Sequence, residues 1–469
     1  MKRVDYKWTL LALVSAAYFL AQGTRNVYGA VLPAIGADLR FSPAAQGAVA
    51  TAFFATFGLM VPVAGFFADF FRRKWTIVIG MAVFSAAVLA TGFAEGFLLL
   101  FVAYGIVNAL GQSLMPPSNS SLIGQLHVET RSRAFAVYQT TFYIGIVVCA
   151  CLGGTLTGLA PGGWRWAFKG LGALGLVWAL VLAKFLRDTP QPVASHPSIR
   201  AAVSGFFGKP TALLLMLALG LYFYATNSFK TWAVTFMEKT MALDHAAASF
   251  NGTFWFYLGA ISGVVLAGVV SDRLRARRPG VRLETNFVGL LLTIPFVLIA
   301  AFTGNLVILC GAVFAFGFAT GVYDSNLYAS LLDVVNPRYR AFSVGLFGCG
   351  GCLLGAPGPL VQGWMINRFG DRASMAALAL FTLAAALVVL LARLVTFNRD
   401  RVSGEFHAEA RSPQSLSENL CGSGAKGQQP LRPLRQNLCE LCVETCNVGS
   451  SGVNAKRAKG ETQRAQQPF

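Results

Sequence analysis

Charged side chains are scarce in this chain. Asp, Glu, Lys and Arg together make up 12% of its 469 residues, whereas 55% of the residues are apolar. A water-soluble protein of this length needs more ionisable groups than that to cover its surface. The composition therefore excludes an ordinary soluble protein and predicts a chain that lies in a lipid bilayer.

Acidic residues are the scarcer sign, with 20 Asp and Glu against 38 Lys and Arg, and the formal net charge is +18. In a soluble protein that excess indicates nucleic-acid binding, but here the basic residues form short runs between apolar blocks. We therefore expect the bilayer, and no nucleic acid, as the partner. The runs occupy alternate gaps, and Lys and Arg near helix ends are retained in the cytoplasm. This pattern predicts a multi-pass protein of the cell (inner or plasma) membrane with both termini cytoplasmic.

Three features that indicate other classes of protein are missing. The first apolar block, 8–33, is long enough to span a membrane and lacks a small-residue cleavage site, so no cleavable signal peptide is expected. No Gly-x-x-x-x-Gly-Lys loop supports an ATP-driven pump. The apolar blocks hold no convincing nucleophile–base set or metal cluster, so we expect neither an enzyme nor a cofactor.

Cysteine is also sparse. Five of the nine cysteines lie in apolar blocks, where a buried thiol behaves as a small hydrophobe, and we predict no disulfide among Cys149, Cys151, Cys310, Cys349 and Cys352. Near the C-terminus the spacing Cys439-x-x-Cys442-x-x-x-Cys446 could bind zinc. Because no folded context surrounds that spacing, we favour reduced cysteines in an unstructured extension.

Long apolar runs are what the chain does have. Each of twelve blocks is long enough to cross a hydrocarbon layer about 30 Å thick as a helix. The blocks are 8–33, 44–70, 74–94, 96–124, 134–160, 164–186, 211–237, 248–271, 284–303, 305–332, 340–366 and 372–396. We predict an all-α integral membrane fold of twelve transmembrane helices.

The apolar pattern breaks in two places, which predicts four regions. Two six-helix bundles, 1–186 and 211–396, are joined by a cytoplasmic linker over 187–210. From residue 397 to 469, Gly, Ser, Gln, Pro, Lys and Arg dominate. Such a segment cannot bury enough apolar surface to offset its ordering entropy, so we expect a disordered cytoplasmic tail.

Two motifs occur twice, in the same order. Gly65–Lys74 (GFFADFFRRK) returns as Gly268–Arg278 (GVVSDRLRARR), and Arg131–Val137 (RSRAFAV) returns as Arg338–Val344 (RYRAFSV). The chain is therefore built as two parallel repeats. Repeats of this size in an apolar chain indicate a secondary transporter whose substrate lies between the halves.

The first of these motifs and the layout of six plus six blocks resemble the major facilitator superfamily over about residues 1–396. Within it, Gly23–Tyr28 (GTRNVY) and Gly111–Pro117 (GQSLMPP) resemble the anion:cation symporter branch, which carries sugar acids and other organic anions. Thr24 and Gln112 stand where that branch usually has an Asp and a Glu, the carboxylates that the resemblance assigns to proton coupling. The resemblance implies alternating access and symport with a cation, H⁺ or Na⁺.

The repeated charged motifs are predicted to gate the cytoplasmic side. Carboxylates that pair with arginines and face the N-terminus of a neighbouring helix can hold one state closed. The alternative is that the basic residues only retain the loops in the cytoplasm. The predicted gating residues are Gly65, Asp69, Arg73, Lys74, Arg133, Asp272, Arg273 and Arg340. The fifth block lacks the Gly-Pro pattern that resembles drug exporters, which favours uptake over efflux.

Arg25 is the strongest candidate for contact with the substrate. It lies within the first apolar block, where an unpaired cation is costly, and its planar fork suits a carboxylate. Tyr18, Gln22 and Tyr28 share its helical face at spacings of three and four. We predict that this polar stripe lines a wet cavity. The alternative is a structural arginine with an internal partner.

Further polar residues in the blocks are predicted to contact the substrate. They are amides and phenols spaced at helical intervals, and the alternative is hydrogen bonding between helices. The set is Asn108, Gln112, Gln139, Tyr143, Tyr222, Asn227, Tyr323 and Asn326.

Asp324 is the carboxylate placed deepest in any block and is the candidate for proton coupling. A carboxyl group in a dry environment can take up a proton near neutral pH. The alternative is a structural pair with Lys230, or with Arg338 and Arg340 at the cytoplasmic end of the same helix.

The predicted protein is thus a monomeric carrier that takes up an organic anion, best a monocarboxylate sugar acid held by Arg25, with a coupling cation. Two alternatives stay open. One is a transporter-like sensor that binds a solute without moving it, and the other is a facilitator or antiporter of a neutral or cationic solute.

Overall fold

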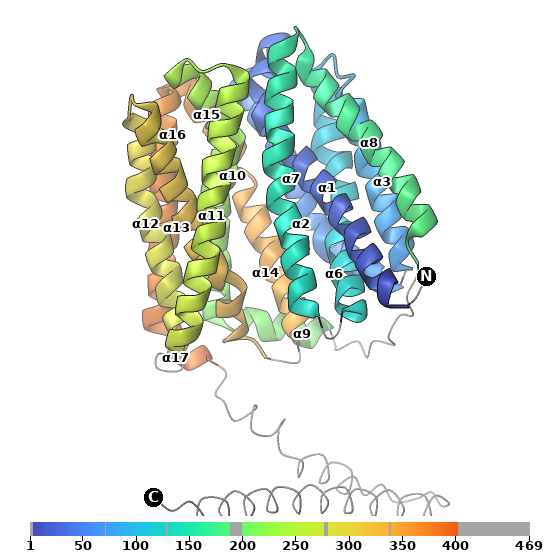
Figure 1. Cartoon of the computed structure of the whole chain (residues 1–469). Coiled ribbons are helices and arrows are strands. Elements are labelled where there is room, and N and C mark those ends of the chain that lie inside the picture. The colour runs from blue at the N-terminus through green and yellow to red at the C-terminus, as the bar shows by residue number, and fades with distance from the viewer. Residues whose placement is uncertain are drawn as a thin grey trace, which may run out of the picture. The chain divides into compact units, whose positions relative to one another are not determined.

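The computed structural model describes residues 3–70, 72–127, 130–187, 199–275, 280–336 and 339–401, and its regular elements there are all helices (Figure 1). In the first half the helices are α1 (Arg3–Leu39), α2 (Pro43–Phe70), α3 (Arg73–Thr91), α4 (Phe97–Leu100), the π-helical η1 (Phe101–Asn108), α5 (Ala109–Ser113), α6 (Met115–Leu126), α7 (Arg131–Leu159) and α8 (Gly163–Phe185). The fourth predicted span is therefore one helical run whose hydrogen-bonding pattern changes along its length.

The second half repeats this layout. After α9 (Ile199–Phe207) come α10 (Pro210–Met241), α11 (His245–Arg275), α12 (Val281–Phe302), α13 (Leu306–Leu332), α14 (Arg340–Gly355), α15 (Gly358–Phe369), α16 (Asp371–Leu391), the π-helical η3 (Ala392–Thr396) and α17 (Phe397–Asp400). Pro357 and Pro359 mark the break between α14 and α15, because proline cannot donate the backbone hydrogen bond that a continuous helix needs.

The prediction of an all-helical membrane fold is confirmed. Within the described residues, eleven helical runs are long and apolar enough to cross a membrane. The remaining predicted span, 8–33, lies in α1, which also packs into the bundle. Gln22, Arg25 and Asn26 make α1 more polar than the other spans. The described helices thus account for all twelve predicted blocks, and α1 alone does so without reaching the apolarity of the others.

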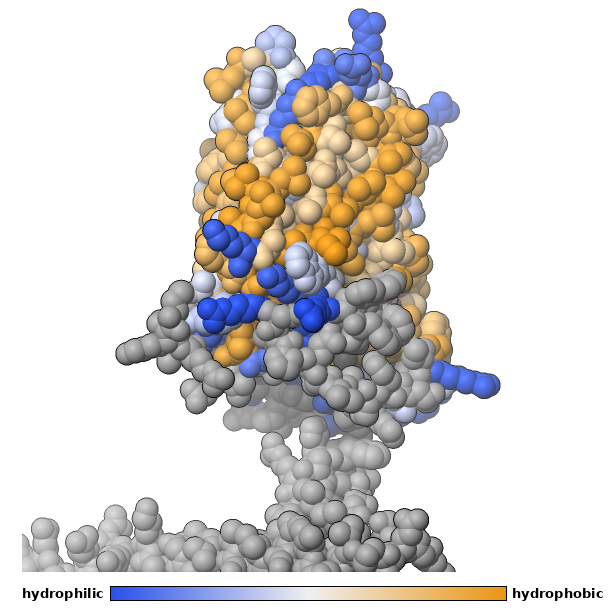
Figure 2. Space-filling view, turned by 90° about the vertical axis from the view of Figure 1, so that its right-hand side faces the viewer, coloured by the Kyte–Doolittle hydropathy of each residue, from blue (hydrophilic) through white to orange (hydrophobic). Residues whose placement is uncertain are grey.

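The outer surface is apolar where lipid would lie. Large side chains point outward along the helices, among them Leu180 at 72% exposure and Val307 at 80%. Figure 2 shows a broad hydrophobic band with hydrophilic residues above and below it. A continuous apolar surface of this extent needs an apolar environment, which a bilayer supplies.

Two ends of the bundle need names. We call the end that carries the N-terminus and helix α9 the linker face, at the bottom of Figure 1, and the other end the far face. α9 lies within the predicted linker 187–210, so part of that linker is helical. The predicted tail begins at 397, yet helix continues to Asp400, and the zinc spacing at Cys439–Cys446 falls outside the described residues.

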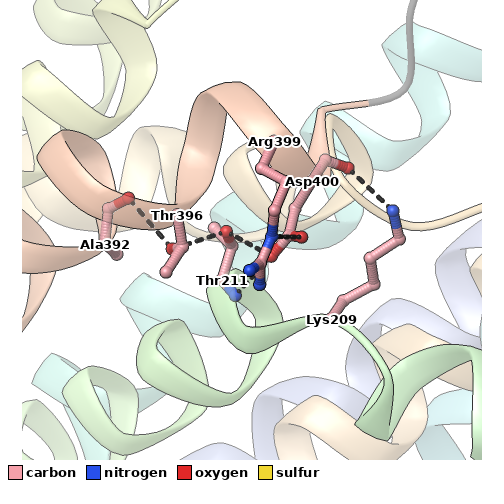
Figure 3. A network of polar contacts seen from close by, with 6 residues as sticks. All are labelled: Lys209, Thr211, Ala392, Thr396, Arg399 and Asp400. Carbon is pink, nitrogen blue, oxygen red and sulfur yellow. Dashed lines mark hydrogen bonds and ion pairs between the residues drawn. The ribbon is translucent and has the colours of Figure 1, made fainter.

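A polar cluster ties the end of the second half to its beginning. The carboxylate of Asp400 accepts hydrogen bonds from the backbone N–H and the hydroxyl of Thr211, at 2.9 and 2.8 Å (Figure 3). Lys209 Nζ donates to the backbone carbonyl of Asp400 at 3.2 Å. Asp400 therefore caps the N-terminus of α10, where a carboxylate satisfies free N–H groups and suits the helix dipole.

The two halves meet closely toward the far face. A Cβ on Gly47 of α2 would lie 2.2 Å from the carbonyl oxygen of Pro359, so only glycine permits this approach of the two backbones. Hydrogen bonds cross the same region, from Leu360 N to Thr51 Oγ1 at 3.2 Å and from Ser249 Oγ to the carbonyl of Ala30 at 3.4 Å. The far face is thus closed by direct contact between the halves.

Toward the linker face the halves separate. A Cβ on Gly65 of α2 or on Gly345 of α14 would meet no described atom within 4 Å, although the same two helices touch one level higher, at Gly58 and Cys352. One apolar core, which includes Ala30 and Ile146 of the first half together with Phe229 of the second, joins the halves on the far side. The close contacts between the halves that the structure describes thus lie toward the far face, and α2 and α14 make none at Gly65 or Gly345.

Candidate functional site

A cavity of about 80 Å³ lies between the halves, where α1, α2 and α7 face α10 and α11. One water molecule needs roughly 10–15 Å³ on this measure, so the cavity holds several waters or a small solute. Its polar lining residues are Gln22, Arg25, Asn26, Tyr28, Tyr104, Asn227, Lys230, Thr231 and Tyr257. Its apolar wall includes Phe53, Phe54 and Phe142.

Arg25 enters this cavity from α1 without an acidic partner. Its guanidinium carbon lies 4.0 Å from the ring centroid of Phe57 and 4.8 Å from that of Phe53, both on α2. Its Nε is buried and has no hydrogen-bond partner among the described residues. Aromatic faces attract a cation but cannot neutralise it. The rings therefore hold the guanidinium in place and leave its charge available to an anion.

Lys230 enters the same cavity from α10 of the second half. Its Nζ lies 5.6 Å from the ring centroid of Phe256. Within the described part of the chain it forms no ion pair at 4 Å or less, and it interacts at longer range with Asp324 and Arg25. The cavity is thus lined by one cation from each half and, among its lining residues, by no carboxylate.

Asp324 lies on α13 close to this cavity. The hydroxyl of Tyr222 on α10 donates a hydrogen bond of 2.8 Å to its Oδ1. Protein atoms surround the carboxylate at longer range, and Lys230 and Tyr143 are near enough for electrostatic interaction. The Asp324 side chain is nevertheless exposed at its surface. Both observations hold for a group on the wall of a water-accessible space between the halves. Asp324 therefore combines a largely enclosed position with an exposed side chain.

Four of the predicted substrate residues line the cavity together, namely Gln22, Arg25, Tyr28 and Asn227. Tyr28 also has a structural contact, because its hydroxyl donates to the carbonyl of Gln46 at 2.8 Å. Tyr18 does not join them. Its ring stacks on that of Tyr138, with centroids 4.2 Å apart. Tyr18 lies one helical turn before Gln22 and is not among the residues that line the cavity.

Asn108 and Gln112 are buried away from the cavity. Gln112 Nε2 donates to Asn108 Oδ1 at 2.9 Å and to Thr24 Oγ1 at 3.3 Å. The alternative of hydrogen bonding between helices therefore describes both amides better than substrate contact does. Thr24 and Gln112, the residues that stand in place of the two expected carboxylates, are thus bonded to each other.

The remaining predicted contacts also lie outside the cavity lining. Tyr323 is buried against Tyr222, with ring centroids 4.4 Å apart, and the hydroxyl of Tyr222 donates to Asp324. Asn326 donates from Nδ2 to Ser271 Oγ at 2.7 Å and so joins α13 to α11. Two predicted residues lie on α7. Gln139 is exposed, and Tyr143 is partly exposed, with its ring centroid 6.1 Å from that of Tyr257 on α11.

The predicted gating residues all belong to the linker face. The side chains of Asp69 and Asp272 fall outside the described residues, so the latch itself stays a prediction. Arg73 is buried, and its Nη1 has no partner among the described residues, whereas Arg133 and Arg273 are exposed. In addition, Arg340 Nη2 donates to the carbonyl of Leu332 at 3.4 Å, and Lys74 Nζ lies 5.5 Å from the ring of Trp75.

Sequence reasoning left out several cavity residues that the fold supplies. Asn26 accepts a hydrogen bond of 3.2 Å from the hydroxyl of Tyr257, which joins α1 to α11 at the edge of the cavity. Lys230 is a further cavity residue that is missing from the predicted substrate contacts. The signal that could have found it is general, because a lysine deep in a transmembrane span usually faces a cavity or a partner.

Comparisons with known proteins agree with this architecture. The sequence model of the Major Facilitator Superfamily matches residues 14–283 and 280–438. The probable sulfoacetate transporter SauU of Cupriavidus necator is 26% identical over 86% of this chain and 98% of that protein. The chloroplastic ascorbate transporter of Arabidopsis thaliana is 24% identical over 77% of this chain and 70% of that protein.

A solved structure has the same fold. It is a bacterial homologue of the human lysosomal transporter Spinster, in an inward-facing and unoccupied conformation. Its TM-score to this chain is 0.75 at 22% identity, and the match covers 85% of this chain and 99% of that one.

Proposed function

Because the chain belongs to the major facilitator superfamily, whose members are membrane transporters rather than enzymes, we propose that it takes up a small organic anion by proton symport and alternating access. The observation that carries this proposal is Arg25, a cation in a cavity between the halves with no acidic partner among the described residues. A buried unpaired cation is costly, and a substrate carboxylate or sulfonate would neutralise it.

The size of the cavity and the names of relatives favour a short acid. A volume of about 80 Å³ suits a compact substrate such as a small sugar acid or a sulfonated acid. Relatives of this chain are named for sulfoacetate and ascorbate, both anionic at neutral pH. Gln22, Asn227 and Thr231 supply amide and hydroxyl groups that can hydrogen-bond a polyhydroxy or carboxylate substrate.

Proton coupling is assigned to Asp324. The positions on α1 and in the fourth span that the family resemblance associates with coupling are occupied by Thr24 and Gln112, which cannot change charge in the physiological range. Asp324 interacts electrostatically with Lys230, and its protonation would free that cation for an anionic substrate. Proton and substrate would then bind together, which is the thermodynamic requirement for symport.

The way the halves meet supports the proposal of alternating access. They are in contact at the far face and lack such a contact at Gly65 and Gly345, which supports a path from the cavity to the linker side in this state. The opposite state requires contacts such as that between Gly47 and Pro359 to open while the linker face closes. The basic linker face would be cytoplasmic, so this would be the inward-open state of a plasma-membrane carrier.

Uptake into proteoliposomes that contain only this protein tests the proposal. An inward proton gradient should drive accumulation of radiolabelled sulfoacetate or gluconate, and a protonophore should abolish it. Substrate binding without accumulation would instead favour a sensor. Accumulation that persists when both the proton and sodium gradients are removed, and that organic anions do not inhibit, would favour a facilitator of another solute.

A further inference from the structure

The number of positive charges that line the cavity indicates how many anionic groups the substrate carries. Arg25 and Lys230 come from equivalent helices of the two halves, since each lies on the first long helix of its repeat. These two helices touch beside the cavity, where a Cβ on Gly29 of α1 would lie 2.6 Å from the carbonyl oxygen of Lys230. Both cations therefore line one small space, one from each half.

The charge balance of this space is positive. Arg25 and Lys230 contribute two positive charges, and Asp324 contributes one negative charge from beyond the lining. In the proton-loaded state proposed above, Asp324 is neutral and both cations are uncompensated by any described carboxylate. A substrate with one anionic group would leave one of them bare in a poorly hydrated site, which is costly.

We propose that the preferred substrate is a short dianion, with one anionic group on Arg25 and the other on Lys230. This inference rests on the proposed function and names its substrate class. The planar guanidinium, held against aromatic rings of α2, suits a carboxylate or sulfonate in a defined orientation. The ammonium is a point charge on a flexible stem, so it tolerates some variation in where the second group lies.

The cavity also limits the distance between the two groups. Its volume is about 80 Å³, and the rings of Phe53, Phe54 and Phe142 form part of its wall. The dianion therefore carries its two charges on a backbone of a few atoms, without a long apolar chain. A substrate that bridges the two halves also favours conformations in which both walls approach it, which links binding to closure.

Matched pairs of acids test this inference on purified protein in nanodiscs at neutral pH. Succinate and butyrate have the same number of carbons, as do malonate and propionate, and the members of each pair differ in the second carboxylate. Isothermal titration should show succinate binding at least about tenfold more tightly than butyrate, because each tenfold corresponds to about 1.4 kcal/mol. Equal affinity for the two acids would overturn the inference.

Variants of Lys230 locate the effect. Lys230→Gln should remove most of the preference for succinate over butyrate, because only Arg25 then remains to bind an anionic group. Butyrate binding should change little. Lys230→Arg should keep the preference. Lys239→Gln is the matched control, because Lys239 lies on the same helix at the far face, 3.4 Å from Asp371. Retention of the full preference in Lys230→Gln would also overturn the inference.

The failures of the two proposals are distinguishable. Monoanions and dianions that bind equally and are both accumulated would overturn the dianion inference and leave the carrier proposal intact. Failure of every organic anion tested to bind or to be accumulated by the wild-type protein would overturn the carrier proposal and the inference with it. If Lys230→Gln does not insert, the wild-type ratio and Lys230→Arg still decide.

Discussion

The two halves share an architecture but surround their cations differently. In the first half, Arg25 lies among the rings of Phe53, Phe54 and Phe57 and has no described acid nearby. In the second half, Lys230 lies within electrostatic reach of Asp324, which accepts a hydrogen bond from Tyr222. In the carrier proposed above, Arg25 would therefore bind its anionic group with no acid nearby, whereas Lys230 would do so only when Asp324 is protonated.

Removing the cation of the first half should have the largest effect. Arg25→Ala should lower anion affinity at least a hundredfold, about 2.7 kcal/mol, because it removes the charge without a replacement partner. The protein should still insert, since Arg25 makes no described ion pair. Arg372→Ala, which alters an arginine bonded to the carbonyl of Phe302 at the far face, is the control. Unchanged uptake by Arg25→Ala would remove it from the site.

Removing the carboxylate of the second half should have a smaller and different effect. Asp324→Asn keeps the shape and can still accept the hydrogen bond from Tyr222, but it cannot change charge. Uptake driven by a proton gradient should fall roughly tenfold or more, as expected when a coupling free energy of 1–3 kcal/mol is lost. Exchange of labelled for unlabelled substrate should persist.

A carboxylate that is not involved in coupling provides the comparison. Asp38→Asn alters an acid at the far face that pairs with Arg165, and its gradient-driven uptake should match that of the wild type. Loss of exchange together with uptake in Asp324→Asn would mean that Asp324 holds the structure or the substrate rather than the proton.

The contact between the halves at the far face can be disrupted without changing Arg25 or Lys230. Gly47→Val adds atoms where a Cβ already meets Pro359 O at 2.2 Å, so it should prevent the far face from closing. Uptake should fall several-fold, and a cysteine introduced at Thr51 should become more reactive from the far side. Gly96→Val is the matched control, because a Cβ there would meet no described atom within 4 Å. Reactivity equal to that of the parent would show that this contact does not seal the far face.

The smallest functional effect is expected at the base of the second half. Asp400→Ala removes the cap of α10 and should cost about 1–2 kcal/mol of stability, the usual range for a helix cap. Thermal unfolding in detergent should show a lower midpoint, while the affinity for the anion stays within about twofold, since Asp400 is remote from the cavity. A large loss of affinity at unchanged stability would contradict a purely structural role.

Much of the fold could be predicted because bilayer thickness constrains the length of apolar runs. All twelve blocks became helices, and the main differences were local, at the break between α14 and α15 and in the extension to Asp400. The site was harder. Helical spacing correctly grouped Gln22 with Arg25, but it also grouped Asn108 with Gln112, whose amides bond to each other and to Thr24. Spacing shows which residues share a face and not which way that face turns.

The sequence by itself determined that this chain is helical, spans a membrane and is built twice, because each of these properties follows from local composition and from repetition along the chain. Only the tertiary structure decided which polar residues share a cavity, that Lys230 lines it together with Arg25, and which end of the bundle is closed. Those outcomes depend on how each helix is rotated against its neighbours, and that rotation is set by contacts between residues far apart in sequence, such as Gly29 with Lys230 and Gly47 with Pro359.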